Sequence, residues 1–183
     1  MVAFATLLTA AVYYPPTNLN LATLIVALIA NIIGALLPDI DQGSNRLWDL
    51  LPGGNTIGKI LKNLFLSHRT LSHSLLGIFL VFKATIWLIP KLLNTSFVNS
   101  QIVIMALLIG YIAHLASDLM TEEGLPLLFP LKIKFGIPPI KQLRIKTGKW
   151  VEKYIVFPGV VLYIIGFGFY NWKIIVEILK HLI

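Results

Sequence analysis

The chain has 183 residues, of which 57% are hydrophobic and only 13% charged, and its mean hydropathy is +0.83. An ordinary soluble domain carries roughly 25% charged residues, so this composition argues against a water-soluble protein. The formal charge of +7 indicates contact with a lipid bilayer and its anionic headgroups, and no direct nucleic-acid binding is expected, since no aromatic stacking platform accompanies the charge. The absence of cysteine excludes disulfides and thiolate metal ligands.

Apolar segments predict an all-α, polytopic membrane bundle that forms a single domain over residues 1–183. A transmembrane helix needs about 20 apolar residues, and the segments that approach this length are 2–14, 21–37, 71–89, 101–120 and 154–170. Pro38 and Pro90 are expected to close the second and third of these segments. Because Met1 is followed by no basic stretch, we expect the first segment to be a retained span and not a cleaved signal peptide.

Three other segments are expected at the membrane surface. Residues 57–65 place apolar side chains at helical spacing with lysines opposite, which predicts an amphipathic interfacial helix. Residues 172–183 indicate, by the same spacing, an amphipathic surface helix or a polar extension of the fifth span. Residues 131–147 alternate apolar and basic residues, which predicts a short basic surface hairpin.

Lysine and arginine indicate the orientation of the bundle. They concentrate between the second and third spans and between the fourth and fifth, at Arg46, Lys59, Lys62, Arg69, Lys132, Lys134, Lys141, Arg144, Lys146, Lys149 and Lys153. Basic loops favour the cytoplasmic side, so five spans place the N-terminus there too. This orientation fits an integral protein of a cell membrane.

Rare polar residues gather at the cytoplasmic ends of the predicted spans. The candidate metal ligands are three histidines and three aspartates, namely Asp39, Asp41, His68, His73, His114 and Asp118. They follow the second span, precede the third and close the fourth, so packing of these helices would bring them to one depth. Taken alone, Asp39 or Asp41 is explained as a turn former or cap, and a histidine as a packing residue. Asp118, near the end of an apolar run, already favours a functional role, because carboxylates inside a membrane are costly. Their joint clustering predicts a metal site.

Spacing within two of the pairs suits coordination. His114 and Asp118 lie four residues apart, which stacks them on one helical face. Asp39 and Asp41 lie two apart, so both carboxylates point the same way if the segment is extended.

His68 and His73 are five residues apart and lie about 140° apart around an ideal helix. They converge only if His68 precedes the helix, with Ser72 or Thr70 as its N-cap.

The mixture of histidine and aspartate without sulfur fits a divalent metal ion. Zinc is favoured, with manganese and ferrous iron as alternatives, and copper(I) is disfavoured. The set can hold one ion with supporting partners or two ions that share a carboxylate. An open metal position would acidify bound water to a pKa near 7 and supply hydroxide for hydrolysis.

Other residues near this set are candidate catalytic helpers. Arg69 can hold an anionic oxygen, and Glu122 or Glu123 can act as a general base or a further ligand. Each is equally well explained as a solvated charge. Ser44 and Ser74 are candidate supporting residues behind the ligands.

Three motifs resemble the YdjM-like family of membrane-bound predicted metal-dependent hydrolases, also described as LexA-binding inner-membrane putative hydrolases. They are Leu36-Leu37-Pro38-Asp39-Ile40-Asp41 with Ser44, His68-Arg69-Thr70-Leu71-Ser72-His73-Ser74, and Gly110-Tyr111-Ile112-Ala113-His114 continuing through Asp118, Thr121, Gly124, Pro126 and Pro130. The resemblance implies a bacterial inner-membrane protein. A more distant similarity to zinc-dependent phospholipases C and nucleases implies a phosphoester substrate. Members of the family often carry a Thr-His pair in the first helix, whereas Phe4-Ala5-Thr6-Leu7 contains no histidine.

The sequence therefore predicts a metal-dependent hydrolase that acts on an ester or phosphoester bond, with a lipid as the candidate substrate, at the cytoplasmic interface. A non-enzymatic membrane protein with a structural metal site that binds a cytoplasmic regulator is the alternative. A metal transporter is less favoured, because only Asn31 and Lys83 are polar near the middle of a span.

Overall fold

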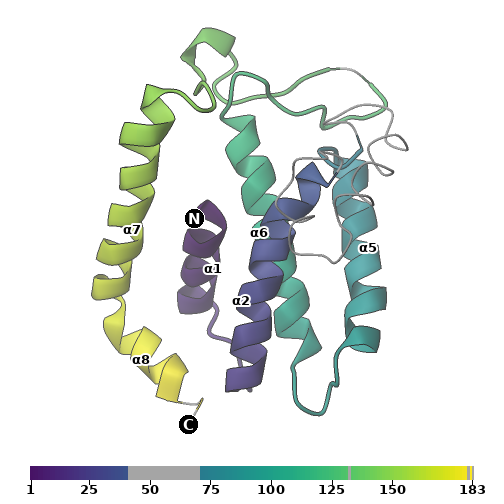
Figure 1. Ribbon diagram of the computed structural model, residues 1–183, viewed down its shortest axis with the longest axis vertical. Helices are drawn as coiled ribbons and strands as arrows, with labels where there is room; N and C mark the ends of the chain where they lie inside the picture. The colour runs from purple at the N-terminus through teal and green to yellow at the C-terminus, as the bar shows by residue number, and fades with distance from the viewer. Residues whose placement is uncertain (41–70, 132, 181, 183) are drawn as a thin grey trace.

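The computed structural model describes residues 1–40, 71–131, 133–180 and 182, and in these ranges the regular elements are all helices, as predicted (Figure 1). The α-helices are α1 (Val2–Tyr13), α2 (Leu21–Leu36), α5 (Leu75–Leu92), α6 (Ser100–Leu119), α7 (Phe157–Tyr170) and α8 (Trp172–Lys180). A 3₁₀ turn, η1 (Leu37–Asp39), extends α2, and a π-helical turn, η3 (Glu152–Val156), leads into α7. A further 3₁₀ turn, η2, spans Lys141–Leu143.

Four of the predicted spans are long and apolar enough to cross a membrane. They are Leu21–Asp39, Leu75–Leu92, Ser100–Leu119 and Glu152–Tyr170. The first predicted span is the exception, because α1 has only 12 residues, whereas a crossing helix needs about 20. The protein is thus an all-α membrane bundle with a short apolar helix packed inside it.

The boundaries of α5 differ from those predicted. The helix begins at Leu75, and its N-cap is Ser74, whose side chain accepts a hydrogen bond from the backbone N–H of Gly77, in place of the predicted Ser72; Thr70 lies outside the described residues. It also continues through Pro90 to Leu92. Pro90 stands in the last turn, where its missing N–H removes a single helical bond while Leu93 still donates to the Ile89 carbonyl.

The predicted hairpin over residues 131–147 is wrong. Outside Lys132, which is not among the described residues, the segment pairs with the stretch that follows α6, through isolated bridges of Thr121 with Ile145 and of Leu125 with Phe135. In the described part of this segment, Phe135 and Ile145 therefore pair with residues that precede the segment, and not with each other. The predicted interfacial helix at 57–65 lies outside the described residues, and the one at the C-terminus is observed as α8.

The closest helix contact joins α2 and α6, which run in the same direction in Figure 1. A Cβ atom added at Gly34 would lie 2.0 Å from the Leu107 carbonyl oxygen, and one added at Gly110 would lie 2.1 Å from that of Asn31. The backbones therefore touch at these glycines, as small residues allow in membrane helices. Asn31, which is buried, donates from Nδ2 to the Ala106 carbonyl at 3.0 Å and fixes the register of the pair.

At the edge of the bundle, α7 lies beside α1 (Figure 1). None of its residues is buried. The two helices are joined by a hydrogen bond of 2.7 Å between the hydroxyls of Thr9 and Tyr163, and by a ring contact of Tyr13 with Phe167. Among the described residues, the candidate ligands lie in η1 after α2, in the turn before α5 and on α6, and none lies on α7.

Candidate metal centre

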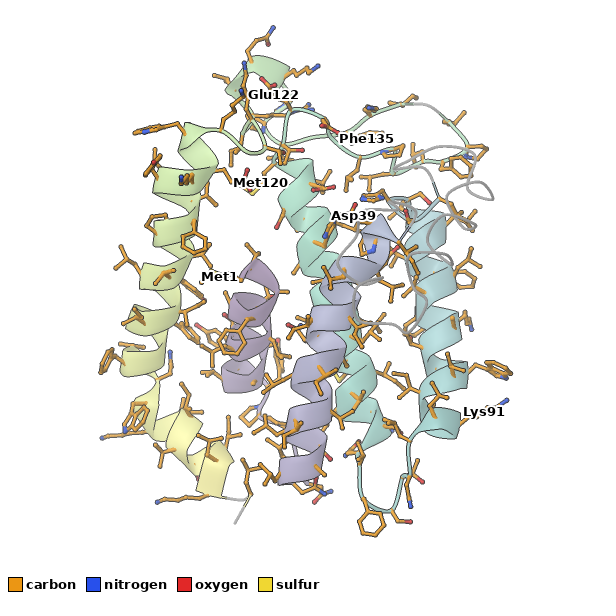
Figure 2. All side chains as sticks on the ribbon, viewed as in Figure 1. Met1, Asp39, Lys91, Met120, Glu122 and Phe135 are labelled. Carbon is orange, nitrogen blue, oxygen red and sulfur yellow. The ribbon has the colours of Figure 1, made fainter. Side chains whose placement is uncertain are left out.

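Three helix ends meet at one end of the bundle. Both α2 and α6 finish there and α5 begins there, since α5 runs opposite to the other two (Figure 1). Figure 2 labels Asp39 at the end of α2, beside the start of α5. We call this region the site end; it also carries the segment from Thr121 to Lys149, which holds four of the nine described lysines.

The backbone around His73 is fixed on several sides. The Ser74 hydroxyl donates to the Leu71 carbonyl at 2.7 Å, which closes the turn before α5. The N–H of Leu75 donates to the Leu127 carbonyl at 3.0 Å, which ties the helix start to the segment after α6. Tyr111 of α6, itself fully buried, donates its hydroxyl to the Ser72 carbonyl. His73 is held with 0% of its surface exposed.

The histidine and aspartate side chains form a compact cluster. Nε2 of His73 lies 3.5 Å from Oδ1 of Asp39 and 3.4 Å from Oδ2 of Asp118. Nε2 of His114 lies 3.7 Å from Oδ2 of Asp39 and 3.7 Å from Oδ2 of Asp118. Ligand atoms of Asp39, His73 and His114 all lie within 4.8 Å of one another, which is a spacing that can hold a metal ion. Each carboxylate thus faces both imidazoles.

The electrostatics of the cluster favour a cation. Burial opposes the charged form of His73, but hydrogen bonding and charge from Asp118 and Asp39 outweigh burial and raise the pKa of His73 above its ordinary value. Nε2 of His114 is buried and makes no hydrogen bond in the part of the chain that the structure describes. A buried ring nitrogen without a hydrogen bond, facing two carboxylates, is explained well by a bound ion.

Four of the six predicted ligands, Asp39, His73, His114 and Asp118, are brought together as the sequence predicted. The structure does not describe the other two, Asp41 and His68, or Arg69 and Ser44. Their roles stay predictions.

The acidic helpers lie on the segment after α6. Glu122 pairs with Lys146 at 3.6 Å, and Glu123 is exposed. In Figure 2, Glu122 stands above the position of Asp39. Catalytic roles for these two glutamates also stay predictions.

Sequence reasoning missed two supporting residues. The hydroxyl of Ser72 lies 3.0 Å from Nδ1 of His73, and Tyr111 holds the Ser72 carbonyl. The sequence indicates Ser72 only as a candidate helix cap, and it includes both residues in the three motifs without giving either a role beside the ligands. The spacing of Tyr111 three residues before His114, on the same helical face, was the signal that could have pointed to it.

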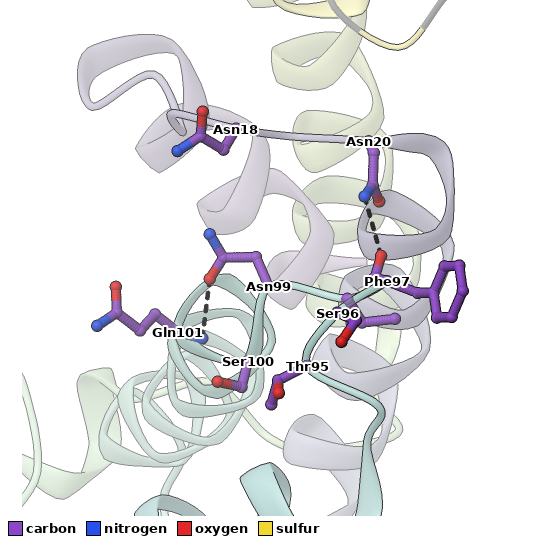
Figure 3. Close-up of a pocket in the computed structure, with 9 residues that line it drawn as sticks. Asn18, Asn20, Thr95, Ser96, Phe97, Asn99, Ser100 and Gln101 are labelled. Atoms are coloured by element: carbon purple, nitrogen blue, oxygen red, sulfur yellow. Dashed lines mark hydrogen bonds between the residues drawn. The ribbon is translucent and has the colours of Figure 1, made fainter.

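A polar pocket of about 370 Å³ lies at the opposite end of the bundle (Figure 3). Two asparagines of the pocket cap helices. Asn20 caps α2 and donates from Nδ2 to the Phe97 carbonyl at 2.9 Å. Asn99 caps α6, because its side-chain oxygen accepts hydrogen bonds from the N–H groups of Gln101 and Ile102. The N–H of Asn99 in turn donates to Thr23. These side chains join the two helix starts, so the pocket contributes to the α2–α6 packing that positions the cluster.

A polytopic helical membrane protein with a buried His/Asp cluster at one end is the class that this fold and site define. The chain belongs to the YdjM inner membrane protein family, whose model matches residues 1–175.

Similar proteins agree with this assignment. The chain is 31% identical over 130 residues to the Bacillus subtilis (strain 168) protein YvsG, covering 71% of this chain and 70% of the relative. It is 32% identical over 124 residues to the inner membrane protein YdjM of Escherichia coli (strain K12), and equally to that of Shigella flexneri. That match covers 68% of this chain and 58% of the E. coli protein. No solved structure matches the chain.

Proposed function

We propose that this protein is a membrane-embedded, metal-dependent hydrolase of an ester or phosphoester bond, with a lipid as its substrate, at the cytoplasmic interface. The observation that carries the proposal is the cluster in which His73 and His114 share the carboxylates of Asp39 and Asp118. Buried ionisable groups on membrane helices are costly, and they are a functional hypothesis by default.

The donor set fits a divalent metal ion. Zinc bonds of about 2.0–2.1 Å to nitrogen and oxygen place tetrahedral ligand atoms roughly 3.3 Å apart. The nitrogen–oxygen separations of 3.4–3.7 Å between the two imidazoles and the two carboxylates need only a small contraction to reach that value. Two histidines with two carboxylates suit zinc, and also manganese or ferrous iron. Asp39, His73 and His114 would hold the ion and leave a fourth position open to water, while Asp118 would face both imidazoles beside them.

The exposed side of the cluster is where a substrate would enter. The side chains of Asp39 and His114 are 27% and 19% exposed, whereas that of His73 is fully buried. A divalent ion held by Asp39, His73 and His114 would supply Lewis acidity for ester hydrolysis at neutral pH. Asp39 directs one carboxylate oxygen at each imidazole and so orients both rings. Asp118 faces the fully buried His73 on the side away from solvent.

The surface around the site end suits a lipid substrate. Trp150 and Tyr154 are exposed where η3 leads into α7, and the Lys153 ammonium lies 5.3 Å from the Tyr154 ring. Aromatic residues with neighbouring lysines are typical of the membrane interface. Lys141 and Lys149 add positive charge on the same segment, which attracts anionic headgroups and favours a cytoplasmic position.

The test combines metal content with activity. Protein purified in detergent should contain close to one divalent ion per chain or more by elemental analysis, and His114→Ala or Asp118→Ala should lose it while the helical content remains. Glu177→Gln, which removes a carboxylate on α8, is the matched control and should keep the ion. Unchanged metal content in both site variants would disprove the metal centre.

Activity is measured on the metal-loaded protein with phospholipids, isoprenoid phosphates and generic esters. We expect hydrolysis that requires His114 and Asp118. A protein that binds its metal tightly through four side chains, yet hydrolyses none of these substrates, would instead favour a structural metal site that supports binding of a cytoplasmic regulator.

A further inference from the structure

The turn before α5 places a serine hydroxyl behind one of the metal-facing histidines. Ser72 Oγ lies 3.0 Å from Nδ1 of His73, while Nε2 on the other side of the ring faces the carboxylates of Asp39 and Asp118. The two nitrogens of this buried ring therefore have different surroundings. Nε2 faces carboxylates that attract a cation, and Nδ1 faces a hydroxyl that can accept a hydrogen bond.

Metal binding through Nε2 decides how this ring must be protonated. A neutral imidazole that gives its Nε2 lone pair to a metal carries its proton on Nδ1. That Nδ1–H needs an acceptor, because a buried donor without one costs about 1–3 kcal/mol. The Ser72 hydroxyl is at hydrogen-bonding distance and has lone pairs for this purpose.

The Ser72 backbone is itself fixed from α6. Tyr111 is completely buried and donates its hydroxyl to the Ser72 carbonyl. Tyr111 lies one turn before His114 on the same helix. The helix that carries one histidine thus also holds the segment that carries the other, so the two rings keep a fixed distance, with centroids 5.7 Å apart.

We propose that Ser72 is a positioning residue of the metal centre: its hydroxyl accepts a hydrogen bond from Nδ1–H of His73, so that Nε2 is free of a proton and can bind the ion. Tyr111 holds Ser72 in place through the bond to its carbonyl. This inference rests on the proposed metal binding. Partners of this kind fix the orientation of a ligating histidine and raise its basicity, and their removal typically costs 10–100-fold in metal affinity.

Zinc affinity of the full chain in detergent, from competition with a chelator, tests the proposal. Ser72→Ala should bind zinc about 10–100-fold more weakly, whereas Ser72→Thr keeps the hydroxyl and should bind near the wild-type level. Ser117→Ala is the matched control, because Ser117 lies on α6 next to Asp118 and donates only to the Ala113 carbonyl at 2.8 Å among the described contacts. Tyr111→Phe keeps the buried ring and should weaken binding less than Ser72→Ala.

A second readout separates positioning from general loss of structure. In zinc-loaded protein with ¹⁵N-labelled histidine, a ring Nδ1–H protected from solvent exchange should be visible by NMR, absent in Ser72→Ala and restored in Ser72→Thr. Wild-type zinc affinity in Ser72→Ala, with the protected proton retained, would overturn the role of Ser72 and leave the metal centre standing. Wild-type protein that takes up no divalent ion would overturn both.

Discussion

The glycine contact between α2 and α6 gives the sharpest prediction about the fold. In Gly110→Ala, the added Cβ would lie 2.1 Å from the Asn31 carbonyl oxygen and 3.0 Å from the Ala35 nitrogen. Close carbon–oxygen contacts lie at about 3.3 Å, so the helices must separate locally by roughly 1 Å. Side-chain motion cannot relieve the clash, because both nearest atoms belong to the backbone.

The energetic cost has two parts. Overpacking of this kind costs about 1–3 kcal/mol, and separation stretches the 3.0 Å bond from Asn31 to the Ala106 carbonyl. Hydrogen bonds between membrane helices average about 0.6 kcal/mol, so we expect a total destabilisation of about 2–3 kcal/mol. The substitution should also weaken metal binding, since α2 carries the turn with Asp39 while α6 carries His114.

Unfolding in detergent, followed by circular dichroism against a denaturant, measures this effect. Gly159→Ala on α7 is the matched control, because a Cβ there meets nothing within 4 Å. Alanine is the better helix former by up to about 1 kcal/mol, so the control should be neutral or slightly stabilised. If Gly110→Ala were as stable as Gly159→Ala, the close contact and its role in aligning the site would be refuted.

Two further predictions concern His73. The carboxylates raise the pKa of His73 above 6.5 in the folded protein. In metal-free protein, the protonated His73 should therefore stabilise the fold fully below pH 6.5, and this contribution should be lost as the pH rises through the pKa of the folded state. If His73→Gln left the dependence of stability on pH unchanged, this prediction would be contradicted. Zinc must displace the same proton, so apparent zinc affinity should fall as pH drops below the raised pKa. Ser74→Ala removes the cap of α5 and should cost about 0.5–2 kcal/mol in denaturant unfolding, whereas Ser74→Thr keeps the hydroxyl that accepts from Gly77 and donates to Leu71, and should cost less.

Much of the candidate centre could be predicted from the sequence because membrane helices leave few arrangements. Once hydropathy defined the spans, their alternating direction placed Asp39, His73 and His114 at one end, and the structure shows them together. The i, i+4 spacing likewise placed His114 and Asp118 on one face, and their side chains share the cluster.

The parts that could not be predicted depend on contacts between distant residues. Alternation in residues 131–147 indicated extended backbone, but the partners of Ile145 and Phe135 lie after α6, where no local pattern points to them. Thr70, Ser72 and Ser74 are all good capping residues, so the sequence does not distinguish them. The helix starts after Ser74, where the Leu75 N–H donates to the distant Leu127 carbonyl.

Helix ends at the cluster have an electrostatic consequence. An α-helix carries partial negative charge at its C-terminus, where cations are favoured and carboxylates are not. Yet Asp118 lies in the last turn of α6, and Asp39 directly follows α2. The negative ends of two parallel helix dipoles therefore lie beside two carboxylates. These negative charges repel one another unless a positive charge lies between them. A bound metal ion, as proposed, or a protonated His73 would reduce this repulsion.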